Sequence, residues 1–192
     1  YLPSLFGEPE RPVSSGYVMK SLLQTMCMRR TFSVWATDRS SPVVDWLRAL
    51  AKKAHEECGG PGVGAVGMCF TGGYALAMAT DDVILAPVLS QPSLPLGLTA
   101  KKRHNIDIAP ADLEVVKGRC ARGLNVLGMR FKGDKFVPAE RFAFLREQLG
   151  DAFIAVELDD ADANPDALMP PHSVITEHLI DQPGQATRAA LD

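Results

Sequence analysis

Apolar residues recur along the chain with two alternating spacings, one typical of helices and one typical of short buried strands. Residues 41–60, SPVVDWLRALAKKAHEECGG, begin with Ser-Pro and end with a glycine pair, so they predict a helix. The next apolar segment, GVGAVGM, is short and glycine-rich and predicts a strand packed closely on both faces. A helix of small residues in TGGYALAMATD and a buried strand in VILAPVL then follow. We expect the apolar stripe of the first helix to comprise Val43, Trp46, Leu47, Leu50, Ala51 and Ala54.

The alternation continues through the second half of the chain. Residues 90–106 contain proline and glycine and predict an irregular crossing over the surface. Helices are predicted in APADLEVVKGRCARG and AERFAFLREQLG, and strands in LNVLGMRF and AFIAVELD. Strands that alternate with helices imply parallel pairing, so we predict a single α/β domain over residues 1–192, with three layers and a mostly parallel sheet.

Both ends of the chain resemble interrupted elements. The opening residues, YLPSLFGEP, are typical of the tail of a strand that leads into a loop. The final residues, QATRAALD, are typical of a helix that has just begun. We therefore expect the complete fold to include an N-terminal strand region and a C-terminal helix that this sequence lacks.

Composition and charge narrow the function classes. The 192 residues include 46% hydrophobic and 22% charged residues, as in soluble globular domains. A net charge of −3 provides no electrostatic footprint for nucleic acid or an anionic membrane, and no apolar run reaches the roughly 20 residues of a membrane helix. The four cysteines are scattered without metal-binding spacing, so we expect a reduced, cytoplasmic protein with no metal or cofactor.

One cysteine stands out because it lies where a predicted strand gives way to a helix. Cys69 follows GVGAVGM, at the strand end where open parallel sheets bind their ligands. Backbone N–H groups and the positive helix end would stabilise its thiolate, and the sharp turn would expose its sulfur. Such a turn needs small neighbours, which Gly67, Gly72 and Gly73 supply. This is the arrangement of a nucleophile elbow, G-x-S-x-G, although Thr71 occupies the position of the second glycine.

Two other interpretations of this stretch stay open. In the first, Cys69 is a buried, inert cysteine in a glycine-rich turn. In the second, GVGAVG forms a dinucleotide-binding turn. Its last glycine falls before the predicted helix opens, however, and no acidic residue ends a second strand at the expected distance.

A thiol nucleophile needs a base, and the base needs a group that orients it. Asp134 follows the strand LNVLGMRF and comes directly after a glycine, and His172 lies on the loop after the last predicted strand. The order nucleophile, acid, histidine, each on a strand-end loop, is the order found in hydrolases built on such sheets. An aspartate after a glycine is also a common turn former, so Asp134 has a purely structural alternative.

Other residues of the same types are weaker candidates. His55 is predicted on the exposed side of a helix, His104 in a basic surface run, and His178 in a helix beyond the candidate base. We expect a solvated acidic loop at Asp159, Asp160, Asp162 and Asp166. We expect packing roles for Cys27, Cys58 and Cys120.

The motifs GMCFTGG, GMRFKGDKFVPAERF and PHSVIT, in this order, resemble those of the dienelactone hydrolase family. The resemblance covers nearly the whole chain and is strongest over residues 62–181. It implies an α/β-hydrolase fold with a Cys-Asp-His triad, in which Cys69 is the nucleophile, His172 the general base and acid, and Asp134 the group that orients the histidine. The backbone N–H of Phe70 would then be one oxyanion-hole donor.

The family also uses parts that this sequence supplies incompletely. Its members carry a further N-terminal strand, and a loop there supplies the second oxyanion N–H and a glutamate that contacts the resting thiol. They also bind an anionic substrate carboxylate with arginines. Arg30, in MCMRRTF, lies where one such arginine is expected, whereas the residue four positions after His172 is Thr176 rather than arginine.

We therefore expect a hydrolase that cleaves a small ester, lactone or thioester through a cysteine acyl-enzyme intermediate. Its expected partner is the small-molecule substrate, without nucleic acid or membrane, and the protein would be a monomer or homodimer. An alternative from another class is a non-catalytic α/β-hydrolase-fold module that binds ligands or partners. The two differ in whether Cys69, Asp134 and His172 converge. A redox-sensing thiol ranks third, because no resolving cysteine lies nearby in the sequence.

Overall fold

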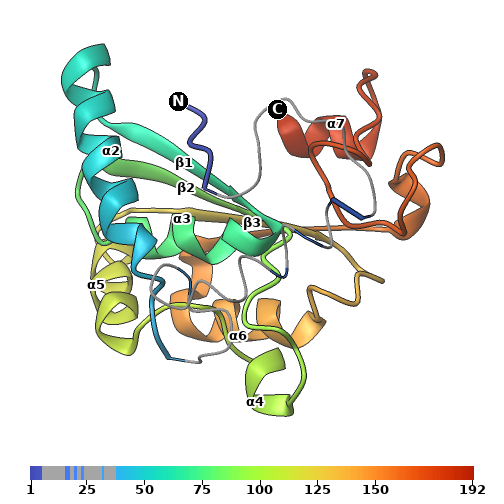
Figure 1. Cartoon of the computed structure of the whole chain (residues 1–192), viewed down its shortest axis with the longest axis horizontal. Coiled ribbons are helices and arrows are strands. Elements are labelled where there is room, and N and C mark those ends of the chain that lie inside the picture. Colours follow the sequence, from blue (N-terminus) through green and yellow to red (C-terminus); the bar gives the residue numbers. More distant parts are fainter. Residues whose placement is uncertain (6–15, 18–19, 21–22, 24–31, 33–37) are drawn as a thin grey trace.

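The centre of the protein is a four-stranded sheet in which every strand runs parallel to its neighbours. The computed structural model describes residues 1–5, 16–17, 20, 23, 32 and 38–192. Each of the four segments predicted as a strand forms a strand, so the mixed α/β class and the parallel pairing are confirmed. In chain order, which is also their order across the sheet, they are β1 (Val63–Met68), β2 (Ile84–Ser90), β3 (Val126–Phe131) and β4 (Phe153–Leu158) (Figure 1).

Helices lie on both faces of the sheet (Figure 1). On one face α3 (Gly72–Met78) packs against β1 and β2, and α6 (Ala139–Leu149) packs against β4. This layer also contains α2 (Val43–Cys58), beside α3, and α5 (Pro110–Cys120), between α3 and α6. On the other face α7 (Ala186–Leu191) packs against β4. All five form within segments that the sequence predicts to be helical.

The crossing from β2 to α5 is more ordered than its composition predicts. It contains a single helical turn, α4 (Ala100–Arg103), whose first residues are capped by the Thr99 hydroxyl, which accepts the N–H of Lys102. A side-chain acceptor at this position satisfies a backbone donor that the turn itself leaves free. The expectation of a wholly irregular crossing is therefore wrong at this turn.

The two faces of the sheet have separate apolar cores. Leu89, Val126 and Phe153 belong to the larger core beneath the helical layer. Met129 and Phe131 point to the opposite face, because side chains alternate along a strand. Their smaller core also contains Leu158, Ala163 and Val174, with Ala186 and Ala190 of α7 packed against it. This second core gathers at the carboxyl ends of β3 and β4, where the candidate histidine loop begins.

The first long helix buries a slightly different stripe from the one predicted. Its buried side chains are Val44, Leu47, Ala51 and Ala54, spaced three and four apart. The prediction was wrong at Val43 and Leu50, which are half-buried, and at Trp46, which is 52% exposed. These three residues belong to an apolar band that is wider than the contact with α3, so only the centre of the band is covered. At the other end of the fold, α6 stops as predicted at Gly150, which has a φ of 58° that favours glycine.

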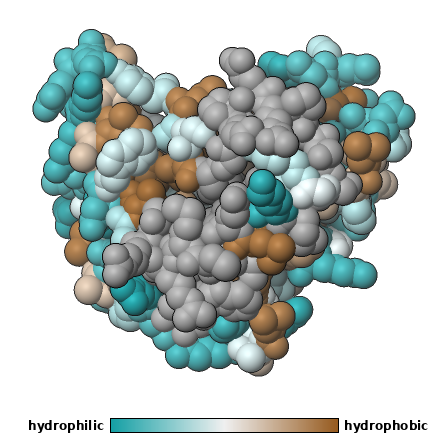
Figure 2. Space-filling model, viewed as in Figure 1, coloured by the Kyte–Doolittle hydropathy of each residue, from teal (hydrophilic) through white to brown (hydrophobic). Residues whose placement is uncertain are grey.

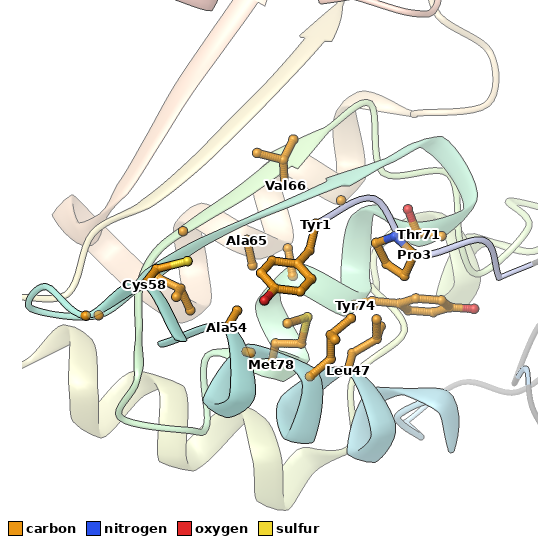
Figure 3. Close-up of a pocket in the computed structure, with 18 residues that line it drawn as sticks. Tyr1, Pro3, Leu47, Ala54, Cys58, Ala65, Val66, Thr71, Tyr74 and Met78 are labelled. Atoms are coloured by element: carbon orange, nitrogen blue, oxygen red, sulfur yellow. The ribbon is translucent and has the colours of Figure 1, made fainter. Parts of the chain in front are cut away.

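The outer edge of β1 borders a shallow apolar groove of about 400 Å³ between β1, α2 and α3. Tyr1 and Pro3 lie along this groove, and in Figure 3 the Tyr1 ring is seated over it. Figure 2 shows apolar atoms gathered beside the hydrophilic surface of α2 in this region. Residues 1–5 form no strand, so the expected strand tail is not found in the described part of that segment. Within the described residues, no helix is both long and apolar enough to cross a membrane.

Candidate active site

Cys69 lies in a sharp turn at the carboxyl end of β1. Met68 is extended, Cys69 has a φ of 50°, and a short 3₁₀ turn (Cys69–Thr71) leads directly into α3. A positive φ is uncommon for a residue with a side chain and costs about 1–2 kcal/mol, so the surrounding structure must hold it in place. Thr71 does so, because its hydroxyl donates to the Met68 carbonyl (2.9 Å) and accepts the Met68 N–H (3.0 Å).

The glycines around the turn are required by close approach rather than by their own dihedral angles. A side chain on Gly67 would collide with the Thr71 carbonyl oxygen. One on Gly72 would meet the backbone of Pro92, and one on Gly73 would overlap a carboxylate oxygen of Asp107. The prediction that these positions must be small is confirmed. The threonine that departs from the elbow motif has a structural role of its own, since it braces the strained turn.

Asp134 and His172 form a buried hydrogen-bonded pair. The Asp134 Oδ2 lies 2.7 Å from the His172 Nδ1, and its Oδ1 accepts the backbone N–H of Phe136 at 2.9 Å. Both carboxylate oxygens are therefore engaged, and the aspartate side chain is almost completely buried. Because Nδ1 is committed to the carboxylate, Nε2 is the ring nitrogen that can face a third group.

Gly133 is small for a reason that the sequence does not reveal. Its backbone N–H donates to the Asp160 Oδ1 at 2.8 Å, and a side chain at this position would overlap that same carboxylate. Gly133 lies in a hydrogen-bonded turn, in which the Asp134 N–H donates to the Phe131 carbonyl at 3.3 Å, and its lack of a side chain also permits the approach of Asp160. The acidic loop after β4 thereby supports the turn that carries Asp134.

The third group near the imidazole is the thiol of Cys69. Burial raises the pKa of the half-buried Cys69 thiol, but a hydrogen bond and the positive charge of His172 lower it. Hydrogen bonds from the Ser93 hydroxyl and the Phe70 backbone N–H lower it further, so the net pKa lies below its ordinary value. The structure thus brings Cys69, His172 and Asp134 together, with the Phe70 N–H directed at the sulfur.

The imidazole shows the complementary shift. Burial lowers the pKa of His172, but the hydrogen bonds and charges of Asp134 and Cys69 outweigh burial and raise it to about 10. A thiol with a lowered pKa beside an imidazole with a raised pKa favours transfer of the proton from sulfur to nitrogen. Both shifts favour a thiolate beside an imidazolium, the form in which a cysteine is nucleophilic.

Ser93 is a site residue that the sequence does not single out. Its hydroxyl lies 3.2 Å from the Cys69 sulfur, and its backbone N–H donates to the Cys69 carbonyl at 2.9 Å. It belongs to the irregular segment after β2, where its neighbours QPSLP carry no recognised motif. No periodicity or spacing marks it, because the contact depends on how β2 and β1 pair.

Arg141, which lies on α6, supports the segment after β2 through hydrogen bonds to its main chain. The side chain is fully buried on α6, and its guanidinium donates to four main-chain carbonyls of that segment, with a longer contact of 3.4 Å to Phe136. Arg141 is spaced four residues from Leu145, on the apolar stripe of α6, and an arginine at such a position is the signal that could have identified it. The four acceptors are Pro92 (2.8 Å), Pro95 (2.5 Å), Lys102 (3.1 Å) and Asn105 (2.8 Å).

The remaining candidates lie away from this cluster or outside the described residues. Arg30, the expected substrate arginine, and Cys27 are outside them. His104 is half-buried and pairs with Glu147 on α6. Cys58 is exposed at the end of α2, so its predicted packing role is wrong, and Cys120 is half-buried against the larger core. As expected, the candidate acids Asp159, Asp160 and Asp166 are exposed, and Asp162 is half-buried.

The histidines at positions 55 and 178 also differ from expectation. His55 is half-buried rather than exposed, because it lies at the border of the buried stripe of α2. His178 lies in a hydrogen-bonded turn and not in a helix, and it is almost completely buried.

No protein-family model matches the chain, and no curated protein matches it in sequence. The resemblance to dienelactone hydrolases therefore depends on the three motifs and the site geometry.

Proposed function

We propose that this protein is a cysteine hydrolase of the α/β-hydrolase type that cleaves a small ester or lactone. The observation that carries the proposal is the convergence of Cys69, His172 and Asp134 from the loops after three parallel strands. Cys69 occupies a left-handed turn between a strand and a helix, and its thiol and the imidazole have complementary pKa shifts. The chain order of the three residues is that of α/β-hydrolases.

In the first half of the reaction, the Cys69 thiolate attacks the substrate carbonyl carbon, and the carbonyl oxygen becomes an oxyanion. In this proposal the Phe70 backbone N–H, whose hydrogen bond lowers the pKa of the resting thiol, donates to that oxyanion as it forms. The bond to the alcohol oxygen then breaks, and the leaving oxygen takes the proton held by the His172 imidazolium. An acyl-thioester and a free alcohol, or the opened lactone, result.

In the second half, the neutral imidazole of His172 accepts a proton from water as the water oxygen attacks the thioester carbon. The C–S bond then breaks, which releases the carboxylic acid and restores the thiolate beside the imidazolium. Asp134 accepts the Nδ1–H throughout, so Nε2 stays directed at the reacting groups. The net reaction consumes one water and one ester bond and leaves the enzyme unchanged.

The surroundings of His172 favour an apolar group next to the scissile bond. The Phe136 ring packs edge-on against the imidazole with 5.5 Å between ring centroids, and 55% of Phe136 is exposed. An exposed aromatic face beside the base offers a wall for the acyl or leaving group. The substrate in this proposal is therefore a small ester or lactone with apolar substituents.

The test is ester hydrolysis by Cys69 variants. We expect wild-type protein to release p-nitrophenol from p-nitrophenyl acetate, and both Cys69→Ala and Cys69→Ser to lose this activity while circular dichroism stays unchanged. Cys58→Ser is the matched control, because Cys58 is a free, exposed cysteine remote from the imidazole. Intact-mass measurement of wild-type protein quenched during turnover should detect a bound acetyl group. Undiminished turnover by Cys69→Ala would refute the proposed nucleophile.

A further inference from the structure

A second histidine lies under the loop that carries His172. His178 is 1% exposed, and its ring packs edge-on against Phe131 at the end of β3, with 5.8 Å between ring centroids. It does not belong to the Cys69–His172–Asp134 cluster, and the chemistry proposed above does not use it. A buried histidine is costly unless its ring nitrogens are paired, so its hydrogen bonds identify its role.

Both ring nitrogens of His178 bind the main chain of the same loop. Nδ1 accepts the backbone N–H of Ser173 at 3.2 Å, and Nε2 lies 2.9 Å from the carbonyl oxygen of Met169. An N–H donor requires an unprotonated Nδ1, and a carbonyl acceptor requires a proton on Nε2. Only the neutral imidazole with its proton on Nε2 makes both bonds at once.

These two bonds bracket His172 along the chain. Ser173 follows it directly, and Met169 precedes it by three residues, so the His178 ring spans the peptide segment that carries the catalytic imidazole. The main chain of His178 strengthens the clamp, because its N–H donates to the Ser173 carbonyl at 3.1 Å. Its carbonyl accepts the N–H of Asn164 at 3.0 Å, which ties the clamp to the acidic loop after β4.

We propose that His178 is a positioning residue that holds His172 in reach of the Cys69 thiolate. Asp134 orients the imidazole through one nitrogen, but that bond fixes the ring only if the main chain of the loop stays in place. The His178 ring supplies this constraint through its two hydrogen bonds to the main chain of the loop. A displacement of about 1 Å at a reacting group can cost about 10²-fold in rate, so a loosened loop has a large catalytic effect.

The inference rests on the proposed function, and three substitutions at His178 test the two hydrogen bonds of its ring. His178→Asn keeps an acceptor near the place of Nδ1, His178→Gln keeps a donor near the place of Nε2, and His178→Phe keeps the ring volume but neither polar atom. We expect His178→Phe to lower kcat for p-nitrophenyl acetate by about 10²-fold with little change in KM. We expect His178→Asn to retain most of the activity, because it preserves the bond to Ser173 beside the base.

A second readout does not depend on ester hydrolysis. The pH dependence of Cys69 alkylation by iodoacetamide, followed by peptide mass spectrometry, reports the thiol pKa. We expect the inflection to move upward in His178→Phe and to return toward wild type in His178→Asn. Val126→Ala is the control for stability alone, since it creates a cavity at the opposite end of β3 and should lower the melting temperature without moving the inflection.

The outcomes distinguish this inference from the function on which it rests. If wild-type protein hydrolyses no ester but the alkylation inflection still moves in His178→Phe, the function fails and the clamp stands. If all three variants keep wild-type kcat and inflection, or change only the melting temperature, the clamp is refuted. Ring-nitrogen chemical shifts test it without any variant, since a proton on Nδ1 of His178 at neutral pH would overturn the assignment.

Discussion

The segment after β2 and the loop after β4 both reach Cys69, but different buried groups hold them. Arg141 donates to four carbonyls of the first segment, from Pro92 to Asn105, with a charge that stays on the guanidinium. His178 holds the second loop with one acceptor and one donor on a neutral ring. The segment after β2 contributes the Ser93 hydroxyl to the Cys69 sulfur, whereas the loop after β4 carries His172, the proposed base.

The two supports differ in how many hydrogen bonds each side chain makes to its segment. A guanidinium with several acceptors gives a rigid support, because loss of one bond leaves the others. A neutral imidazole with two bonds supports its loop only while both partners stay in place. In the proposed reaction, the segment supported by Arg141 carries Ser93, which contacts the Cys69 sulfur, and the loop supported by His178 carries His172, which would transfer protons in both half-reactions.

The largest expected effect comes from removing the rigid support. Arg141→Leu leaves several buried carbonyls without donors, and each such group costs about 1–3 kcal/mol, so we expect a loss of at least about 3 kcal/mol in the free energy of unfolding. Urea denaturation measures this loss. Arg146→Leu is the matched control on the same helix, because its half-exposed ion pair with Glu157 contributes about 0–1 kcal/mol. Equal losses in the two variants would show that Arg141 is no special support.

A smaller effect is expected from the group that this support positions. Ser93→Ala removes a hydroxyl donor 3.2 Å from the sulfur, so the thiol pKa rises and kcat falls about 10-fold, as for loss of a hydrogen bond to a charged group. Ser93→Thr keeps the hydroxyl and should restore most of the activity. The measurement is kcat for p-nitrophenyl acetate together with the alkylation inflection of Cys69. An unchanged inflection in Ser93→Ala would contradict the proposed contact with the thiolate.

The smallest expected effect is on the pH dependence of the free energy of unfolding, to which the Cys69 thiol and the His172 imidazole contribute. In the unfolded chain the proton stays on the Cys69 thiol, whose ordinary pKa is 9.0, and the imidazole, with an ordinary pKa of 6.5, is neutral. In the folded protein His172 keeps its proton up to about pH 10, and the pKa of the Cys69 thiol is lowered. Between pH 6.5 and 9.0 the two shifts therefore oppose each other, because the raised imidazole pKa makes stability fall as pH rises and the lowered thiol pKa makes it rise.

Outside this window the signs differ. Below pH 6.5 the histidine binds its proton in both states, so only the lowered thiol pKa is left, and any slope there has stability falling as pH falls. Above pH 9.0 the unfolded thiol loses its proton while His172 keeps its own up to about 10, so stability falls as pH rises. We expect wild type to lose about 1 kcal/mol relative to His172→Gln across this upper interval. A difference that is flat to pH 10 would contradict the ion pair.

Much of the fold could be predicted from local patterns. The four strands and the helices α2, α3, α5, α6 and α7 lie in segments that apolar spacing predicts, and some of their ends are marked by glycine, as at Gly150. Cys69, Asp134 and His172 could be identified as well, because strand-end positions in chain order converge at one edge of a parallel sheet. Trp46 could not be placed, since the width of a buried stripe depends on the partner helix.

The supporting residues could not be predicted for a different reason. Arg141 and His178 bind main-chain groups, which leave no signature in the pattern of side chains, although an arginine on the apolar stripe of α6 marks Arg141 as unusual. Ser93 reaches the Cys69 sulfur from 24 residues away, through a contact that no spacing reveals. Gly133 is a similar case, because a side chain at this position would overlap the Asp160 carboxylate, which is distant in sequence. Residues that carry chemistry are visible in a sequence, whereas residues that place them depend on tertiary contacts.

The most direct measurement of the central claim is the pH dependence of Cys69 alkylation in wild type and in His172→Ala. The account predicts an inflection below the ordinary thiol pKa of 9.0 in wild type, and a clear upward movement when the imidazole is removed. Cys58, which is exposed and lies at the end of α2, serves as the internal reference and should keep the same alkylation rate in both proteins. An inflection at or above 9.0 in wild type, or the same inflection in both proteins, would contradict the thiolate–imidazolium pair.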